Sequence, residues 1–271
     1  MKRSCADLKA MARERLSGKY GIYIGALLVY YLITTALSML LTLVFPTFTV
    51  AALLNGLVSS GALVLFYVTE FIISLILSIF TIGFLKMYLD GSRGYPVIFS
   101  DLFYGFRHHP DRAILLSLLL GLITLACLLP GYIVLFAAVY FLSFPALITG
   151  IFLVLAGAVL AVVFSIGFSQ AFYLLTDYDD LGPVRAMKES WRMMKGHKGR
   201  YFYMKLSFLG VLLLTILTCG IALLWVSPYL SMTQTMFYRE LDGELDQEDQ
   251  GVEFDNGYQE PPYHQENPWQ N

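Results

Sequence analysis

AILLSLLLGLITLACLLPGYIVLFAAVYFLSFPALITGIFLVLAGAVLAVVFSIGFSQAFYLLT, residues 113–176, contains no Asp, Glu, Lys, Arg or His, and this run decides the fold class. A helix needs about 20 apolar residues to cross a hydrocarbon core about 30 Å thick, so the run is long enough for two crossings. Residues 20–85 hold one such charged side chain, Glu70, and residues 206–238 hold none. Long apolar runs of this kind predict transmembrane helices.

The composition supports a membrane protein. Of the 271 residues, 57% are hydrophobic and 14% are charged, whereas a soluble domain usually has about 25% charged residues. Residues 1–238 carry 17 Lys+Arg and 10 Asp+Glu, and residues 239–271 carry 1 and 10. Because the basic residues flank apolar runs, membrane orientation and contact with anionic headgroups explain them better than nucleic-acid binding does.

Three polar segments, residues 2–19, 86–112 and 177–205, separate the apolar runs and carry 6, 4 and 7 Lys+Arg. The positive-inside rule places all three in the cytoplasm, which requires an even number of crossings between them. The chain is therefore expected in the cell membrane with both termini cytoplasmic. The expected spans are 20–45, 61–85, 113–129, 146–175, 203–218 and 221–238.

An internal repeat favours two crossings rather than one in residues 206–238. The second and third polar segments each begin with Gly-Phe (83–84 and 167–168), followed by Tyr-Leu and then by Pro-Val. Each ends with an amphipathic run, a glycine and basic residues. We therefore predict an all-α membrane helix bundle of about six spans in three hairpins, each preceded by a cytoplasmic amphipathic helix.

The amphipathic runs follow helical spacing. In the first run Leu8, Met11, Ala12 and Leu16 form an apolar stripe behind a capping box at Ser4–Asp7. In the third run the apolar residues recur at i, i+3, i+7 and i+10, with basic residues on the other face. Such helices are typical of a membrane interface. The residues of this candidate interfacial helix are Val184, Met187, Lys188, Trp191, Arg192, Met194 and Lys195.

Residues 239–271 are acidic, rich in Gln and Pro, and poor in aliphatic side chains. This composition predicts a disordered tail. The tail is either a solvated acidic segment or a binding site for a membrane or cytoplasmic protein.

Three stretches resemble a family of bacterial membrane proteins catalogued as domain of unknown function 975. They are SDLFYGF (100–106), MKESWRMMKGHKGRYFYMKLSFLG (187–210) and WVSPYLSMTQTMFYREL (225–241). The resemblance covers about residues 1–241. That family is similar in turn to the membrane domain of some glycerophosphodiester phosphodiesterases. The resemblance implies a multi-span inner-membrane protein and no catalytic residue.

Glu70 is the candidate functional acid within the membrane. Intramembrane acids often mark ion or proton pathways. However, the helix from Glu70 to Lys86 would be roughly 24 Å long, which places Glu70 near the outer interface. Interfacial anchoring is therefore favoured over transport.

No other pattern predicts a catalytic, cofactor or metal site. His108 and His109 are adjacent, so they would point about 100° apart on a helix and would not chelate one ion well. Gly91–Gly94 lacks the context of a phosphate-binding loop and is interpreted as a flexible link. Asp90, Asp101, His108 and Asp177 could still converge at the cytoplasmic face, and the sequence does not show whether they do.

Three functions remain open at this point. The favoured one is a non-enzymatic membrane-organising or accessory protein that acts through its cytoplasmic face. The alternatives are a transporter or channel for a small solute, and a membrane enzyme acting on lipid. The near absence of intramembrane charge argues against transport, and the absence of catalytic motifs argues against turnover.

Overall fold

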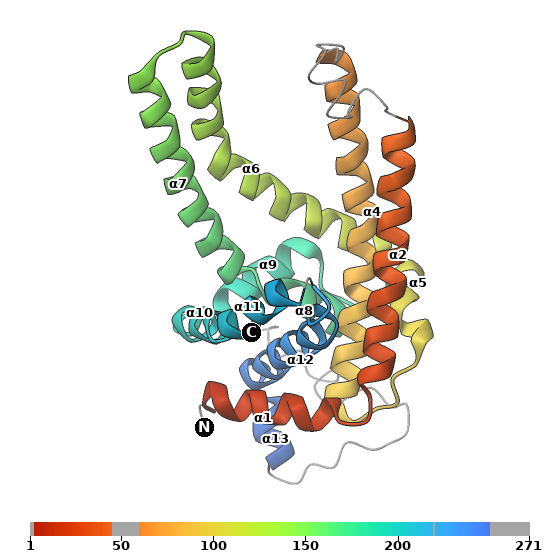
Figure 1. Cartoon of the computed structure of the whole chain (residues 1–271). Coiled ribbons are helices and arrows are strands. Elements are labelled where there is room, and N and C mark those ends of the chain that lie inside the picture. Colours follow the sequence, from red (N-terminus) through yellow and green to blue (C-terminus); the bar gives the residue numbers. More distant parts are fainter. Residues whose placement is uncertain (1–2, 45–59, 219, 250–271) are drawn as a thin grey trace.

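A computed structural model describes residues 3–44, 60–218 and 220–249, and the chain is helical throughout these ranges, with short links between helices (Figure 1). Residues 45–59, which join the first two expected spans, lie outside the described residues. The helices are α1 (Cys5–Leu16), α2 (Tyr20–Val44), α4 (Ser60–Arg93), η2 (Phe99–Phe103), α5 (Tyr104–Arg107), α6 (Pro110–Tyr140), α7 (Phe144–Gly167), α8 (Ala171–Asp177), α9 (Pro183–Met193), α10 (Lys198–Leu206), α11 (Leu209–Leu217), α12 (Leu223–Asp242) and α13 (Glu244–Asp249).

Five segments of the described chain are long and apolar enough to cross a membrane. Their large apolar side chains point outward, as with Phe136 at 77% and Phe152 at 68% exposure. A soluble protein does not expose so much apolar surface, and the predicted membrane character is therefore confirmed. The five segments are Tyr20–Leu41, Val64–Arg93, Pro110–Tyr140, Phe144–Asp177 and Lys198–Leu217.

The helices α6 and α7 form a hairpin that small residues allow to close tightly. A Cβ atom on Gly157 would lie 2.2 Å from the backbone oxygen of Cys127, and one on Gly131 would lie 2.6 Å from the backbone nitrogen of Val154. Glycine permits such close helix packing within a membrane. The hairpin leans away from α2 and α4, which run side by side (Figure 1).

The expected boundary of the third span, 113–129, is wrong. The helix α6 continues through Pro130 to Tyr140, and the turn follows at residues 141–143. The helix changes direction along its length in Figure 1, and proline is a common cause of such bends because it removes one backbone hydrogen bond. A proline inside an apolar run therefore marked a bend rather than a turn.

One end of the molecule, which we call the base, contains α1, α8, α9, α12 and α13 (Figure 1). The capping box predicted at Ser4 is present, and it starts α1 across the direction of α2. The stripe Leu8, Ala12 and Leu16 is fully buried and shares one core with Met232 and Met236 of α12. The first amphipathic run thus covers protein with its apolar face.

The chain after residue 238 departs from the prediction of disorder. The helix α12 continues to Asp242 and ends at Gly243, whose φ of +85° is the left-handed conformation that glycine tolerates best. It is followed by α13, in which Glu244 and Leu245 are buried. Residues 239–249 are therefore part of the folded base, and residues 250–271 lie outside the described residues.

The two ends of the described chain meet, which restricts the topology. Arg3 makes ion pairs with Asp246 and Asp249 of α13, and Arg15 of α1 pairs with Glu248. Since α1 and α13 lie on the same side, the number of crossings between them must be even. The five candidate spans cannot all be single crossings unless α12 also crosses.

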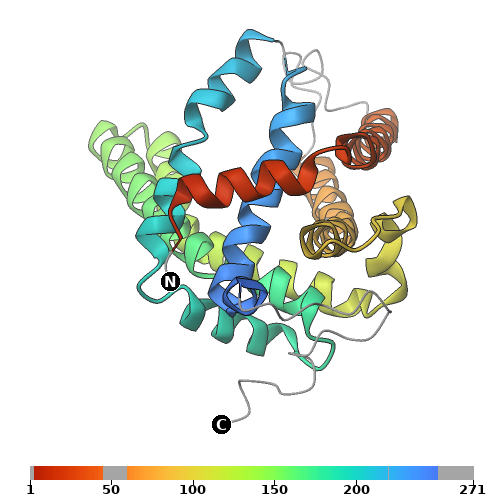
Figure 2. The same cartoon turned by 90° about the horizontal axis from the view of Figure 1, so that it is seen from below.

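The last hairpin runs in a different direction from the first two. Figure 2 views α2 and α4 nearly end on, while α11 and α12 extend lengthwise across the view. In addition, α12 was not found among the candidate spans, and it buries Thr233, Thr235 and Arg239. These features distinguish α11–α12 from the apolar pairs α2–α4 and α6–α7.

Candidate functional site

A buried group of charged side chains in the base is the most distinctive chemical feature of the described chain. Three of its members are the last residues of three different helices: Arg93 of α4, Asp177 of α8 and Asp242 of α12. The other members lie within α12 and α13. We call this group the ionic cluster; its residues are Arg93, Asp177, Arg239, Asp242, Glu244 and Glu248.

Arg93 joins α4 to the two other chain segments. Its Nη2 donates to Asp177 Oδ2 at 2.8 Å and to Glu244 Oε1 at 2.5 Å, and its Nε donates to Glu244 Oε2 at 3.2 Å. All three side chains are at most 3% exposed. Hydrogen bonds between ionised groups are strong in such surroundings, so Arg93 is a buried connector between helix ends.

Arg239 lies on the other side of Glu244. Its Nε donates to Glu244 Oε2 at 2.7 Å and its Nη2 donates to Glu248 Oε2 at 2.9 Å. Its Nη1 donates at 2.8 Å to the backbone oxygen of Ser92, one of the carbonyls at the end of α4 that lack a helical partner. Arg239 thus caps α4 while it binds α13.

Two tyrosines complete the cluster. Tyr238 donates to Asp177 Oδ2 at 2.9 Å, and Tyr178 donates to Asp242 Oδ2 at 3.1 Å. Burial and the neighbouring carboxylates raise the pKa of Tyr178 well above its ordinary value, so its hydroxyl stays protonated as a donor. Tyr238 also stacks on Tyr173 of α8 with ring centroids 5.0 Å apart.

Asp177, Glu244 and Glu248 each form an ion pair with an arginine of the cluster. Asp242 is the cluster carboxyl for which the described part of the chain shows no such pair. Burial, and then the nearby Asp177 and Glu244 carboxylates, raise its pKa from 3.8 to about 7. Two like charges in a buried site disfavour ionisation of both. Near neutral pH, therefore, Asp242 exchanges between a neutral and a charged form.

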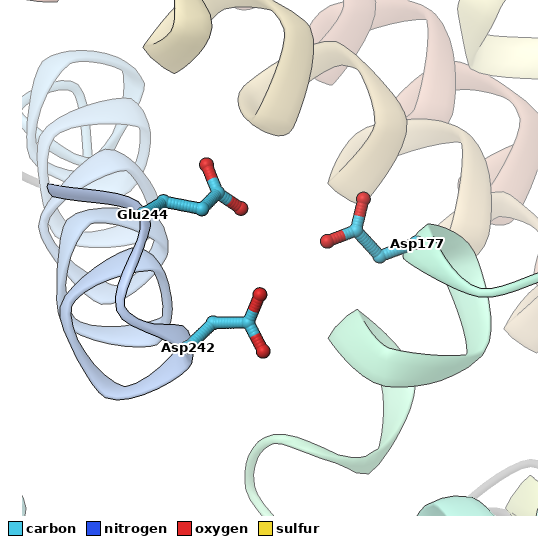
Figure 3. A group of neighbouring side chains, drawn as sticks. All are labelled: Asp177, Asp242 and Glu244. Atoms are coloured by element: carbon cyan, nitrogen blue, oxygen red, sulfur yellow. The ribbon is translucent and has the colours of Figure 1, made fainter. Parts of the chain in front are cut away.

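The carboxyl groups of Asp177, Asp242 and Glu244 point toward one another in Figure 3 and lie within 4.8 Å. This spacing alone would suit a cation. However, Arg93 occupies oxygens of both Asp177 and Glu244, and Arg239 occupies a second oxygen of Glu244. A metal ion would have to displace these guanidinium groups, so the arrangement fits a structural ion-pair network better than a metal centre.

Of the residues considered for catalysis, Asp90, Asp101 and His108 lie outside the ionic cluster. Asp90 pairs with Lys86 at 3.0 Å, Asp101 accepts from the backbone N–H of Ile98, and His108 stacks on Tyr104. Asp177 is the one of these four residues that belongs to the ionic cluster. Glu70 is exposed on α4, about 35 Å of helix from Arg93.

The helix α9 buries a different stripe from the one predicted. Met187 and Met194 are buried as expected, but Val184 is 53% exposed, and the buried face also includes Ala186 and Ser190. The stripe is rotated because α9 packs against α8 in the protein core. Its opposite face exposes the basic side chains of Arg185, Lys188 and Arg192, and Lys195 is exposed in the turn that follows the helix.

Trp191 closes the joint between α7 and α8. Its ring lies against Gly167, where a Cβ atom would come within 2.3 Å of Trp191 Cε3. The Ser190 hydroxyl donates to the Gly167 carbonyl at 2.9 Å and accepts from the Gln170 N–H at 3.1 Å. These contacts explain why the helix predicted over 146–175 is interrupted between Gly167 and Ala171.

The interpretation of Gly91–Gly94 as a flexible link is wrong. The helix α4 continues to Arg93, Gly91 packs against the Tyr23 ring, and Ser92 is fully buried. Sequence reasoning missed Arg93 because it lies within the glycine-containing stretch Gly91–Gly94. It missed Asp242 and Glu244 because they lie near the start of the acidic region. A Tyr followed four residues later by Asp, at 173–177 and 238–242, was the available signal.

These features define a multi-pass helical membrane protein with a folded polar base. Comparison with known families gives the particular assignment. A family model described as protein of unknown function (DUF975) matches residues 1–244, and the chain belongs to this family. The matched region ends at Glu244, so it includes the three helix ends at the ionic cluster. No curated protein and no solved structure matches the chain.

Proposed function

We propose that this protein is a non-enzymatic membrane-organising or accessory protein that acts through its base. The observation that carries the proposal is the ionic cluster, where Arg93, Asp177 and Asp242 bring three helix ends together. The buried charges bind one another and hold the helices in place. A rigid polar platform on membrane helices suits interaction with other components.

The basic face of α9 is the surface that we assign to this interaction. The apolar side of α9 packs in the protein core. Lys188 and Arg192 are therefore exposed on its other side, and Lys195 is exposed in the turn that follows. The partner expected from this charge is an acidic protein surface next to the membrane, with anionic headgroups as competing ligands. We further propose that the base is cytoplasmic in a bacterial cell membrane, as the positive-inside rule indicates.

The even number of crossings leaves two topologies. The sequence repeat favours six spans, whereas the crosswise direction of α11 and α12 favours four, with this hairpin lying near the interface (Figure 2). We favour four. A cysteine introduced at the exposed Leu217 distinguishes them: an impermeant thiol reagent added to intact cells labels it in the six-span topology and leaves it unlabelled in the four-span topology.

Co-purification from membranes tests the interaction. The triple variant Lys188→Glu, Arg192→Glu, Lys195→Glu should lose proteins that cross-link to the wild type in cells. The control, Arg13→Glu with Arg107→Glu, changes exposed basic residues outside α9 and should retain them. Equal recovery of every cross-linked protein with the triple variant would refute the assignment of α9.

Residues 250–271 are a second proposed contact for a protein partner because they are acidic. A chain ending at Asp249 keeps Glu244, Glu248 and their ion pairs, so it should fold. Loss of a cross-linked partner from this shortened chain supports a role for the tail, and full retention argues against it.

A transporter remains the second candidate because of Glu70. If Glu70→Gln abolished solute flux through proteoliposomes containing the wild-type protein, transport would replace the organising role. The similarity to the membrane domain of glycerophosphodiester phosphodiesterases is a further proposal. It would be supported if this chain increased the membrane activity of such an enzyme.

A further inference from the structure

A cavity of about 500 Å³ lies among α6, α7, α8, α10 and α12. This volume falls within the range of roughly 300–1,000 Å³ that is typical of sites for small molecules. Its walls include Leu120 and Ile123 of α6 and Val162 and Phe164 of α7, all within candidate membrane spans. An apolar ligand or chain could therefore occupy it from the membrane.

Polar side chains from three elements reach the cavity. Ser169 follows the end of α7, Gln234 comes from α12, and Lys205 comes from α10. The remaining wall is mostly apolar and includes Phe168, Phe172 and Phe202. Lys205 is thus the charged side chain of a mainly apolar cavity.

Lys205 gives the cavity a positive charge. Its side chain is exposed, and among the described residues its ammonium makes no hydrogen bond or ion pair; it lies 5.2 Å from the centroid of the Tyr201 ring. A basic side chain near the membrane interface attracts anionic headgroups. An anionic group at this position would supply the missing partner.

We propose that this cavity binds one anionic phospholipid. The phosphate contacts Lys205, with Gln234 as a hydrogen-bonding neighbour, and an acyl chain lies along Phe164 and Ile123. The cavity is separate from the basic face of α9, so the proposal does not depend on the proposed function. It predicts selection by headgroup charge, which lipids that merely surround the protein do not show.

Native mass spectrometry of the detergent-purified protein tests this site with phosphatidylglycerol and phosphatidylcholine of identical chains. We expect one phosphatidylglycerol to stay bound, with an apparent affinity at least about tenfold higher than that of phosphatidylcholine. Lys205→Ala should lower phosphatidylglycerol affinity about tenfold. Ser165→Trp, which places a large side chain on the cavity wall, should lower the affinity for both lipids.

Two controls make the result specific. Lys188→Ala removes an exposed positive charge on α9 and should leave phosphatidylglycerol binding unchanged. Lys205→Arg keeps the charge and should retain most of the binding, which separates charge loss from misfolding. Equal binding of the two lipids by the wild type, or equal phosphatidylglycerol binding by Lys205→Ala and wild type, would overturn the proposal.

Discussion

Arg239 has the largest fully buried side chain in the described chain, and it is charged. Burial of an ion is unfavourable unless partners replace its water. Arg239 meets this requirement with Glu244, Glu248 and the Ser92 carbonyl. Its stabilising effect therefore depends on the whole set of partners. Without Arg239, Glu244 would keep Arg93 and Glu248 would keep Arg15, but the Ser92 carbonyl would lose its side-chain donor.

Arg239→Met should lower the free energy of unfolding by about 3 kcal/mol, because it removes the charged hydrogen bonds to Glu244 and Glu248 and the donor to the buried Ser92 carbonyl. The measurement is thermal or denaturant unfolding in detergent. The control is Arg192→Met, which removes an exposed pair with Glu189 and should cost less than about 1 kcal/mol. Similar losses in the two variants would show that the cluster has no special stabilising role.

Asp242 makes stability depend on pH. Its pKa rises from 3.8 to about 7 in the folded chain, so the folded carboxyl holds its proton where the unfolded one has lost it. The contribution to stability is fully present below the unfolded pKa and is lost as the pH rises through the folded pKa. The thermal unfolding midpoint should therefore decrease as the pH rises from about 4 to about 7.

Asp242→Asn should make this pH dependence shallower and raise the midpoint at about pH 8, because asparagine does not ionise. Asp111→Asn, the same change at an exposed position on α6, should leave the slope unchanged. The interpretation fails if the wild type and Asp242→Asn show the same slope.

At the scale of single elements, the joint between α7 and α8 shows what the sequence could and could not predict. The apolar run and Gly167-Phe168 indicated a membrane segment near this point, but the predicted span ran over 146–175, whereas α7 ends at Gly167 and α8 begins at Ala171. They did not predict that Trp191 would pack on Gly167, because that contact depends on how α9 folds back. The buried face of α9 differs from the predicted one for the same reason. Periodicity predicts that a helix has an apolar face, but it does not predict which element packs against that face.

Gly167→Ala should destabilise the protein, since its Cβ atom would overlap the Trp191 ring. In the background of Trp191→Ala, the same glycine substitution should cost much less, which a double-mutant cycle of unfolding free energies measures. Gly121→Ala in α6 is the matched control, because nothing lies within 4 Å of its Cβ position. Additive effects of the two substitutions would contradict the packing account.

At the scale of the whole molecule, hydropathy predicted an all-helical membrane protein, and the structure confirms this class. Hydropathy could not predict the base. Arg93 and Glu244 are 151 positions apart along the chain. Nothing in the sequence near Arg93, Asp242 or Glu244 indicates that these side chains meet. The acidic composition after residue 239 also concealed α13, whose carboxylates are stabilised by basic residues elsewhere in the chain.

The central claim is that the base, including α9, lies on the cytoplasmic side and that the turn between α6 and α7 lies on the other side. Single cysteines in a background without the three native ones test it directly, through labelling of cells with an impermeant maleimide. Leu142→Cys, at a 91% exposed position in that turn, should react in intact cells. Lys188→Cys should react only after permeabilisation. Reaction of Lys188→Cys in intact cells, or reaction of the two sites from the same side, would contradict the account.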